Sequence, residues 1–233
     1  MADLFREVDE AMHQERMAKL WTENRVYIIG FVIGTILLTA ALSGYRTWDA
    51  GVKEKQTATL IALQDAPEYP ANILDSEKLD MRAGLRGITL LQAAGAFLDQ
   101  DKRDEAAALY ERAGADAALP DEFRHLGILM AVRLSSHDEN ADGTALLEKL
   151  SPILKADNSP WNAHARLEAA AINARMLQNY ENAQTHLKII ADTKDLPDSL
   201  YQRARALAHI YKLEQKSPLP HAEETKEKTK EPS

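Results

Sequence analysis

The sequence predicts an all-α protein in which one N-terminal transmembrane helix precedes a series of helical hairpins. Three observations support this fold class. The run from Val26 to Tyr45 contains no charged side chain. The rest of the chain is rich in Ala and Leu and shows no sustained alternation of apolar and polar residues, which favours helices over strands. Related segments also recur along the chain at fixed offsets, as expected for stacked helical units.

Composition excludes several classes of function. The chain has 233 residues, a formal net charge of −8 and no cysteine. Without cysteine it has no disulfide framework, no thiol nucleophile and no Cys-ligated zinc site. Nucleic acid is not an expected partner, because phosphate binding requires clustered Lys and Arg, and the sequence has no dense basic stripe.

The apolar run is long enough to cross a bilayer, which requires about 20 residues. Aromatic and arginine side chains suited to the membrane boundary flank it, namely Trp21, Arg25, Tyr27, Tyr45, Arg46 and Trp48. A cleaved signal peptide is the competing interpretation, since small residues precede Gly44. We favour a retained anchor, because the run exceeds the roughly 7–15 residues of a signal peptide. The segment that precedes Val26 also holds six acids against four bases, unlike a signal peptide's basic start.

Charge does not determine the orientation of this helix. Close to the run, three Lys or Arg side chains lie on each side, so the positive-inside rule makes no prediction. Gly30 and Gly34 form a small-xxx-small pair that would let two membrane helices approach closely and the chain self-associate. The alternative is that glycine is simply common in membrane helices.

The chain divides into five expected regions. They are a polar helix (1–25), the transmembrane helix (26–45), a helical stalk (46–66), a helical repeat domain (67–215) and a disordered tail (216–233). Within the repeat domain we expect helices over residues 76–100, 104–115, 120–136, 143–156, 159–178, 180–193 and 197–214. Ser159 and Pro160 predict the N-cap and first turn of the fifth of these helices.

Two offsets relate the helical segments. "LPDEF" begins at Leu119 and "LPDSL" at Leu196, and the same step carries Ala106 onto Ala183. A shorter step carries Leu90 onto Phe123, close to the tetratricopeptide period of about 34 residues. The repeat pattern is degenerate, with no Trp and late prolines, so an unrelated Ala-rich helical bundle is the alternative. The fold expected is a degenerate tetratricopeptide-like α-solenoid.

No motif in the chain predicts catalysis, a metal site or a cofactor. "DENADG" resembles the start of a calcium loop, but Lys149 stands where the bidentate acid is needed, which favours a solvated turn. The seven histidines are scattered, and phosphate-binding glycine loops and nucleophile elbows are absent. We therefore expect a protein that is not an enzyme.

A binding surface is the remaining expectation. Residues out of register with the packing pattern are predicted to line a concave groove for an extended or helical peptide. These residues are Ile88, Leu91, Leu98, Arg124, Ile128, Ile172, Arg175, Met176, Tyr201 and Arg205. The alternative is that several of them pack against the stalk or a neighbouring helix.

The order of parts resembles a known bacterial family. "FREVDEAMHQERMAKLWTENRVYIIGFVIG", with "KLW" at 19–21 and Tyr45, Arg46 and Trp48 at the far end of the run, is similar to the N-terminus of single-pass tetratricopeptide-repeat-like proteins. That family includes the YfgM-like ancillary subunits of the SecYEG translocon. The resemblance covers nearly the whole chain except the tail, and the family has no catalytic residues to carry over.

The resemblance implies a location and a set of partners. It implies a single-pass protein of the bacterial inner membrane, with its N-terminus in the cytoplasm and its repeat domain in the periplasm. It also implies protein export as the function, with translocon subunits, periplasmic chaperones or exported chains as partners. The other expected function is a scaffold subunit of another envelope complex, for cell-wall synthesis or division.

Overall fold

The computed structural model describes residues 2–76, 79–138 and 140–216 of the chain. In these ranges the protein is all-α, with nine helices and no strand. The described part divides into two compact units, with the boundary between Ala58 and Thr59. The tail expected at 216–233 lies outside the described residues, apart from Lys216, which ends the last helix.

Helix α1 runs from Ala2 to Gln64 without interruption. It therefore joins the predicted polar helix, transmembrane helix and stalk in one element. Within the described residues one stretch, Glu23–Gln64, is long and apolar enough to cross a membrane, and none of its apolar core is buried by protein. Phe31, for example, is 77% exposed. Such a helix fits a membrane anchor or a signal sequence.

The end of α1 is followed by a short helix, α2 (Ala71–Leu74), which the sequence pattern does not predict. Pro67 and Pro70 end the long helix, because proline has no N–H to donate and clashes with the preceding turn. Asn72 Nδ2 donates to the carbonyl oxygen of Leu63 at 2.9 Å, which caps the last turn of α1. Ile73 of α2 is fully buried, so this turn is held by the hydrophobic core.

Seven longer helices follow. They are α3 (Ala83–Asp99), α4 (Arg103–Ala115), α5 (Asp121–Ser135), α6 (Gly143–Lys155), α7 (Asn162–Arg175), α8 (Tyr180–Asp192) and α9 (Asp198–Lys216). The seven helices predicted in this region are confirmed, with two differences at their starts.

The first difference concerns α3, which begins at Ala83 and not at Ser76 as predicted. Arg82 has an extended conformation, with ψ at 147°, so the helix cannot continue before it. Leu79 and Met81 are buried against the core of the first helical pair instead. These two apolar residues fall in the span predicted to be helical, but here they are buried contacts of a non-helical segment, in which the Met81 backbone N–H donates to the Leu79 carbonyl oxygen at 2.9 Å.

The second difference concerns α7, whose N-cap is Trp161 and not Ser159. Ser159 Oγ lies 2.9 Å from His125 Nδ1 of α5 and accepts from the backbone N–H of Trp161 at 3.3 Å. The indole Nε1 of Trp161 donates to the carbonyl oxygen of Glu122 at 2.8 Å. These contacts with α5 position the turn, so the helix starts later than the Ser-Pro signal predicts.

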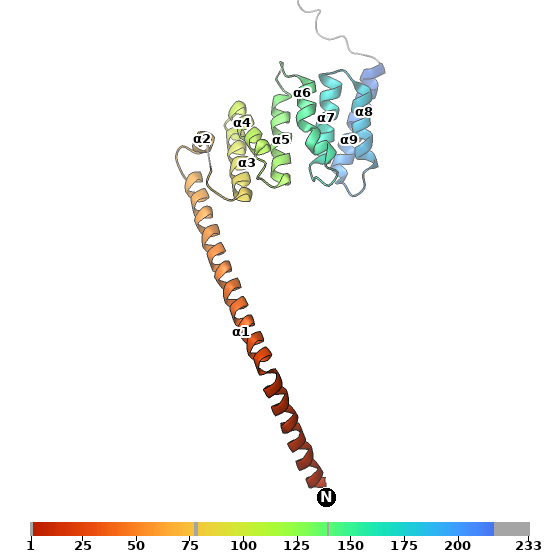
Figure 1. Cartoon of the computed structure of the whole chain (residues 1–233). Coiled ribbons are helices and arrows are strands. Elements are labelled where there is room, and N and C mark those ends of the chain that lie inside the picture. Colours follow the sequence, from red (N-terminus) through yellow and green to blue (C-terminus); the bar gives the residue numbers. More distant parts are fainter. Residues whose placement is uncertain (1, 77–78, 139, 217–233) are drawn as a thin grey trace, which may run out of the picture. The chain divides into compact units, whose positions relative to one another are not determined.

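The helices of the second unit pack as sequential pairs, as Figure 1 shows for α3 to α9. Each helix contacts the next in the chain, and α3, α5, α7 and α9 also contact one another in turn. Three clusters of buried residues form the core, centred on Phe97, Leu150 and Leu187. Burial of each such side chain stabilises the fold by about 1.5–3 kcal/mol.

Helices α4 and α5 make an unusually close contact at two glycines. A Cβ atom added to Gly127 would lie 2.7 Å from the carbonyl oxygen of Tyr110 and 2.8 Å from the backbone N of Gly114. A Cβ atom added to Gly114 would lie 2.8 Å from Ile128 Cγ1. Glycine is therefore required at position 127, because the atoms in the way belong to the backbone of α4.

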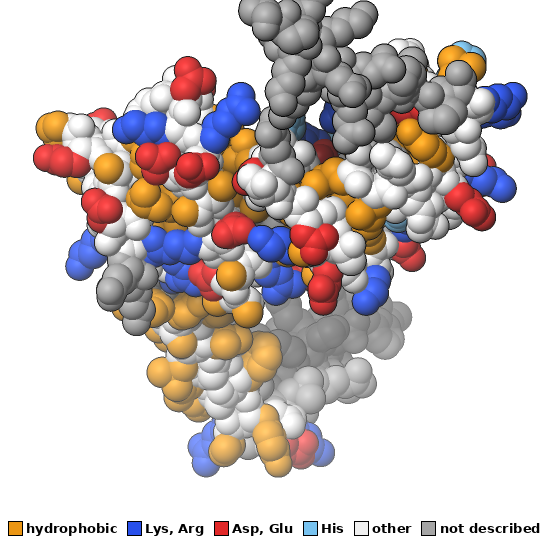
Figure 2. Space-filling model, turned by 90° about the horizontal axis from the view of Figure 1, so that it is seen from above, with side chains coloured by type: hydrophobic (Ala, Val, Ile, Leu, Met, Phe, Trp, Pro, Cys, Tyr) orange, Lys and Arg blue, Asp and Glu red, His pale blue; other side chains and the backbone are white. Residues whose placement is uncertain are grey.

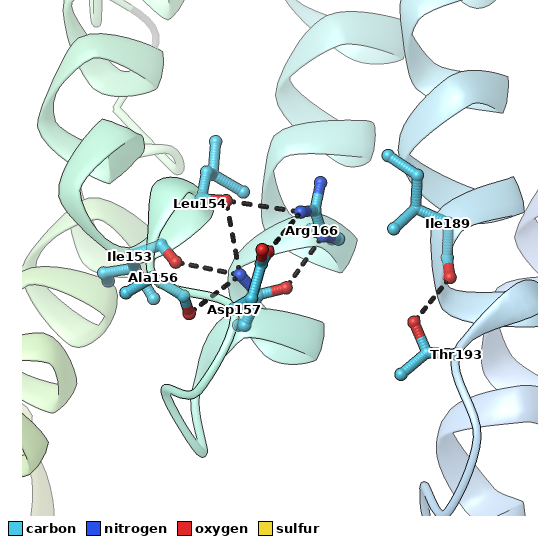
Figure 3. A network of polar contacts seen from close by, with 8 residues as sticks. Ile153, Leu154, Ala156, Asp157, Arg166, Ile189 and Thr193 are labelled. Atoms are coloured by element: carbon cyan, nitrogen blue, oxygen red, sulfur yellow. Dashed lines mark hydrogen bonds and ion pairs between the residues drawn. The ribbon is translucent and has the colours of Figure 1, made fainter.

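Polar side chains of α7 cap the preceding helix (Figure 3). Asn162 Nδ2 lies within hydrogen-bonding distance of the carbonyl oxygens of Ile153, Leu154 and Ala156, at 2.9, 3.3 and 3.2 Å. Arg166 donates through Nε to Asn162 Oδ1 at 2.7 Å and through a terminal nitrogen to the Leu154 carbonyl at 3.2 Å. The last carbonyls of α6, which have no partner within that helix, thus find partners on the next pair.

Candidate functional site

Two carboxylates of the segment "DENADG", which resembles a calcium loop, have structural partners within the chain. Asp142 Oδ1 accepts from the backbone N–H of Thr144 at 2.8 Å and so caps α6. Asp138 Oδ1 accepts from the backbone N–H of Asn140 at 3.0 Å. Among the described residues, no group of three His, Cys, Asp or Glu side chains is arranged to hold a metal ion.

The face of the protein seen in Figure 2 carries intermixed acidic and basic side chains. Charge on this face is therefore not gathered into one large region of a single sign. A candidate site has to be sought in hollows of the surface, where a few side chains converge.

A pocket of about 350 Å³ lies where α5, α7 and α9 meet. We call it the three-helix pocket. Its lining consists of Arg133, Ser136, His137, Leu167, Glu168, Ala171, Ile172, Arg175, Met176, Arg203, Leu207 and Tyr211. All of these residues belong to the second compact unit. The pocket combines apolar side chains with three arginines, so it can hold an apolar group beside an anion.

The single glutamate of the pocket is already neutralised. Arg133 Nε lies 3.2 Å from Glu168 Oε2, and Ser136 Oγ lies 3.2 Å from Glu168 Oε1. The side chain of Glu168 is only 12% exposed. One arginine thus serves to hold the buried carboxylate, and it joins the end of α5 to the middle of α7.

The other two arginines of the pocket do not hold Glu168. Arg175 of α7 and Arg203 of α9 are exposed, and neither has a hydrogen bond or ion pair within the described residues. Tyr211 is 4% exposed, and its ring lies 6.5 Å from that of Tyr180. Burial raises the pKa of Tyr211, so its hydroxyl stays protonated and can donate.

Three predicted groove residues meet at this pocket, namely Ile172, Arg175 and Met176. Ile172 is 1% exposed and belongs both to the core and to the pocket wall. Met176 is half-buried, while Arg175 is exposed. The part of the predicted groove on α7 therefore corresponds to a real hollow; whether it binds a peptide stays a prediction.

The remaining predicted groove residues do not lie in the three-helix pocket. Tyr201 and Arg205 line a second hollow beside the α8–α9 turn, where the Tyr201 hydroxyl donates to the Thr193 carbonyl. Ile128 packs against Gly114 of α4 and lines a third hollow.

The other four are on α3 and α5. Leu91 and Leu98 are half-buried against the core of the first pair, while Ile88 is 37% exposed. Arg124 pairs with Asp121 at 2.6 Å. The ten residues are thus spread over several surfaces of α3, α5, α7 and α9.

Sequence reasoning missed the α9 side of the pocket, formed by Arg203, Leu207 and Tyr211. Leu200, Ala204, Leu207 and Tyr211 follow the i, i+4, i+7, i+11 spacing of a packed helical stripe. That stripe identifies which face of α9 meets α7, and Arg203 lies at its edge. Tyr201 and Arg205, which were predicted instead, lie together on one side of this face and line the second hollow.

Three buried or paired groups elsewhere have shifted pKa values. The hydrogen bond from Arg86, with Nε 2.7 Å from Asp116 Oδ2, lowers the pKa of Asp116. Burial lowers the pKa of His164, and the charges of Arg133 and Arg203 lower it further. Burial also lowers the pKa of His186, with Arg166 adding to the shift.

Gly30 and Gly34 lie on the exposed surface of α1, and nothing comes within 4 Å of a Cβ atom added at either. Their role in contact between membrane helices stays a prediction. Comparison of the chain with protein-family models, with curated proteins and with solved structures gives no match.

Proposed function

We propose that this chain is a membrane-anchored scaffold that binds protein partners through a degenerate tetratricopeptide-like α-solenoid. The working part of such a protein is a surface, and its ligands are peptide segments held between helices. The proposal needs three things: a repeated helical unit, an anchor, and an accessible hollow on the repeat domain.

One observation carries the proposal: residues related by the step from Leu119 to Leu196 also agree in backbone conformation and in burial. Asp101 and Gln178 are related by the same step and occupy corresponding turns between paired helices, and both have positive φ, at 58° and 51°. The third described non-glycine residue with positive φ, Asp195 at 62°, has no such counterpart at Ala118. Ala106 and Ala183, again at this step, are both fully buried. Non-glycine residues rarely adopt positive φ, so this agreement supports a duplicated unit over an irregular bundle.

The anchor is proposed to be α1. Its apolar stretch fits a bilayer, and the helix continues past Gly44 to Gln64 without interruption. We propose a single-pass protein of the bacterial inner membrane, with the N-terminus in the cytoplasm and the helical pairs in the periplasm. The orientation rests on the resemblance of the N-terminal segment to single-pass tetratricopeptide-repeat-like proteins.

The same resemblance leads us to propose an accessory role at the Sec translocon, linking export to periplasmic chaperones. The three-helix pocket supports this role in one respect. It offers an apolar wall and arginine side chains, which suit varied polypeptide segments. We propose no catalytic activity and no cofactor.

In vivo photocrosslinking tests the scaffold function. A photoreactive residue at Met176 lies at the three-helix pocket, while one at Lys188, exposed on α8, serves as the matched control. We expect translocon subunits and periplasmic folding factors to be captured from position 176 and not from 188. Capture of cell-wall or division enzymes alone would assign the chain to a different envelope complex.

Fusion of a reporter after Trp48 tests the orientation. We expect activity from a reporter that works only in the periplasm and none from one that works only in the cytoplasm. The mature N-terminus is the second readout: a soluble protein that begins near Gly44 would show that α1 is a cleaved signal.

A further inference from the structure

We propose that the three-helix pocket selects peptide segments in which an acidic residue stands next to an aliphatic one. This inference rests on the proposed scaffold function and specifies the chemistry of its ligand. Arg175 and Arg203 would receive the carboxylate, and the apolar wall would receive the neighbouring side chain.

Charge favours an anionic ligand at this place on an otherwise acidic chain. The pocket is lined by three arginines and one glutamate, a formal surplus of two positive charges, whereas the whole chain carries −8. Arg133 already pairs with the glutamate. Glu214, which acts on Tyr211 from α9, does not line the pocket.

The positions of two arginine side chains also favour an anionic ligand. Arg175 and Arg203 come from different helices, line the same pocket, and have no partner among the described residues. Guanidinium groups bind carboxylates through paired N–H donors, which gives direction as well as attraction. The lowered pKa of His164, caused by burial and then by Arg133 and Arg203, agrees with a positive potential on this side of α7.

The apolar wall determines what stands beside the anion. Leu167, Ile172, Leu207 and Met176 line the pocket together with the arginines. Leu167 and Ile172 are already buried, so the accessible part of this wall is Met176 and Leu207, which are half-buried. A phosphate ion or lipid headgroup would leave these two side chains in water, whereas an aliphatic side chain would cover them. The volume lies at the lower end of the roughly 300–1,000 Å³ of ligand pockets, so it admits one or two side chains. A peptide that presents both groups fits best.

The test uses the full chain in nanodiscs of zwitterionic lipid and three end-capped fluorescent peptides, read by anisotropy. The peptides alternate Leu with Glu, Leu with Gln, or Leu with Lys. We expect the Leu/Glu peptide to bind about tenfold more tightly than the Leu/Gln peptide. Equal binding of these two peptides would overturn the proposal.

Variants locate the binding site. Arg175→Gln with Arg203→Gln should weaken the Leu/Glu peptide about tenfold and leave the Leu/Gln peptide unchanged. Arg205→Gln, on the same helix but outside the pocket, is the matched control and should change neither. Arg175→Glu with Arg203→Glu should transfer the preference to the Leu/Lys peptide. Binding that the glutamine pair does not alter would place the site elsewhere.

Competition distinguishes a peptide site from a simple anion site. Inorganic phosphate should displace the Leu/Glu peptide only weakly, and a Ser/Glu peptide should bind less tightly than Leu/Glu, because it leaves the apolar wall uncovered. Equal affinity for Ser/Glu, or full displacement by phosphate at low concentration, would refute the apolar half of the proposal.

The two proposals can fail separately. If the crosslinks from position 176 persist in the Arg175→Gln and Arg203→Gln variant, the pocket chemistry is wrong and the scaffold function stands. If the wild-type protein captures no export partner while Leu/Glu binding and its loss are observed, the pocket chemistry stands and the cellular role is wrong.

Discussion

Replacement of Gly127 by Ala should destabilise the helical domain, although alanine is the better helix former. The new Cβ would lie 2.7 Å from the Tyr110 carbonyl oxygen, 2.8 Å from the Gly114 backbone N and 3.0 Å from Ala113 Cβ. The first two contacts are with backbone, which cannot rotate away as a side chain can. Helices α4 and α5 therefore have to separate, and the buried atoms around the crossing lose contact.

The magnitude follows from two opposing terms. Overpacking a core costs about 1–3 kcal/mol, and two backbone contacts place this site near the upper end. Alanine in place of a helical glycine returns about 1 kcal/mol. The net loss should be about 2 kcal/mol, which lowers the midpoint of thermal unfolding by about 4–8 °C in a domain of this size.

Gly95→Ala is the matched control for this prediction. Gly95 also lies within a helix, α3, but nothing comes within 4 Å of an added Cβ. The same change should there stabilise the protein by about 0.5–1 kcal/mol. Thermal unfolding of the full chain in nonionic detergent, followed by circular dichroism, measures both. If Gly127→Ala is as stable as Gly95→Ala, the close contact of α4 and α5 does not exist as described.

Three further predictions concern polar groups. Asn162→Ala should lower the free energy of unfolding by about 1–3 kcal/mol, because the last carbonyls of α6 lose their donor, whereas exposed Asn182→Ala should change it by less than about 0.5 kcal/mol in urea titrations. The lowered pKa of Asp116 contributes stability that is present above its ordinary value and is lost as pH falls through the folded-state pKa; Asp116→Asn should flatten the urea midpoint between about pH 5 and pH 3. The pKa values of His164 and His186 are lowered, so the unfolded chain binds protons first and stability should fall as pH drops from about 7 to 5, less steeply in His186→Phe.

The helical content and most helix ends follow from the sequence, because Ala-rich amphipathic stretches alternate with short polar joints. The start of α3 does not. Leu79 and Met81 fall in a span that was predicted to be helical, yet they lie in a non-helical segment, and their burial depends on the core of the first pair. The N-cap of α7 was missed for a related reason: Ser159 contacts His125, which is distant in the sequence, and no local signal reveals that contact.

The candidate site shows the same limit. Three residues on α7 could be named from the repeat: Ile172 and Met176, which pack with the cluster shared by α5 and α6, and the exposed Arg175. The α9 residues could not be named from the repeat step in the sequence, because the face of α9 that lines the pocket depends on how α9 packs against α7. Leu207 and Tyr211 continue the buried stripe of α9, and only the position of that stripe against α7 brings Arg203 to the pocket.

The capping of α6 by Asn162 and Arg166 has a consequence for motion. The end of one helical pair cannot fray without breaking bonds that belong to its successor, so opening of that junction has to involve both. Amide hydrogens near Ile153 should then exchange with solvent at the rate of the larger cooperative unit, not at that of an ordinary helix end. A ligand that binds in the three-helix pocket and stabilises α7 would also slow exchange at the end of α6. Exchange at this turn would therefore report whether the pocket is occupied.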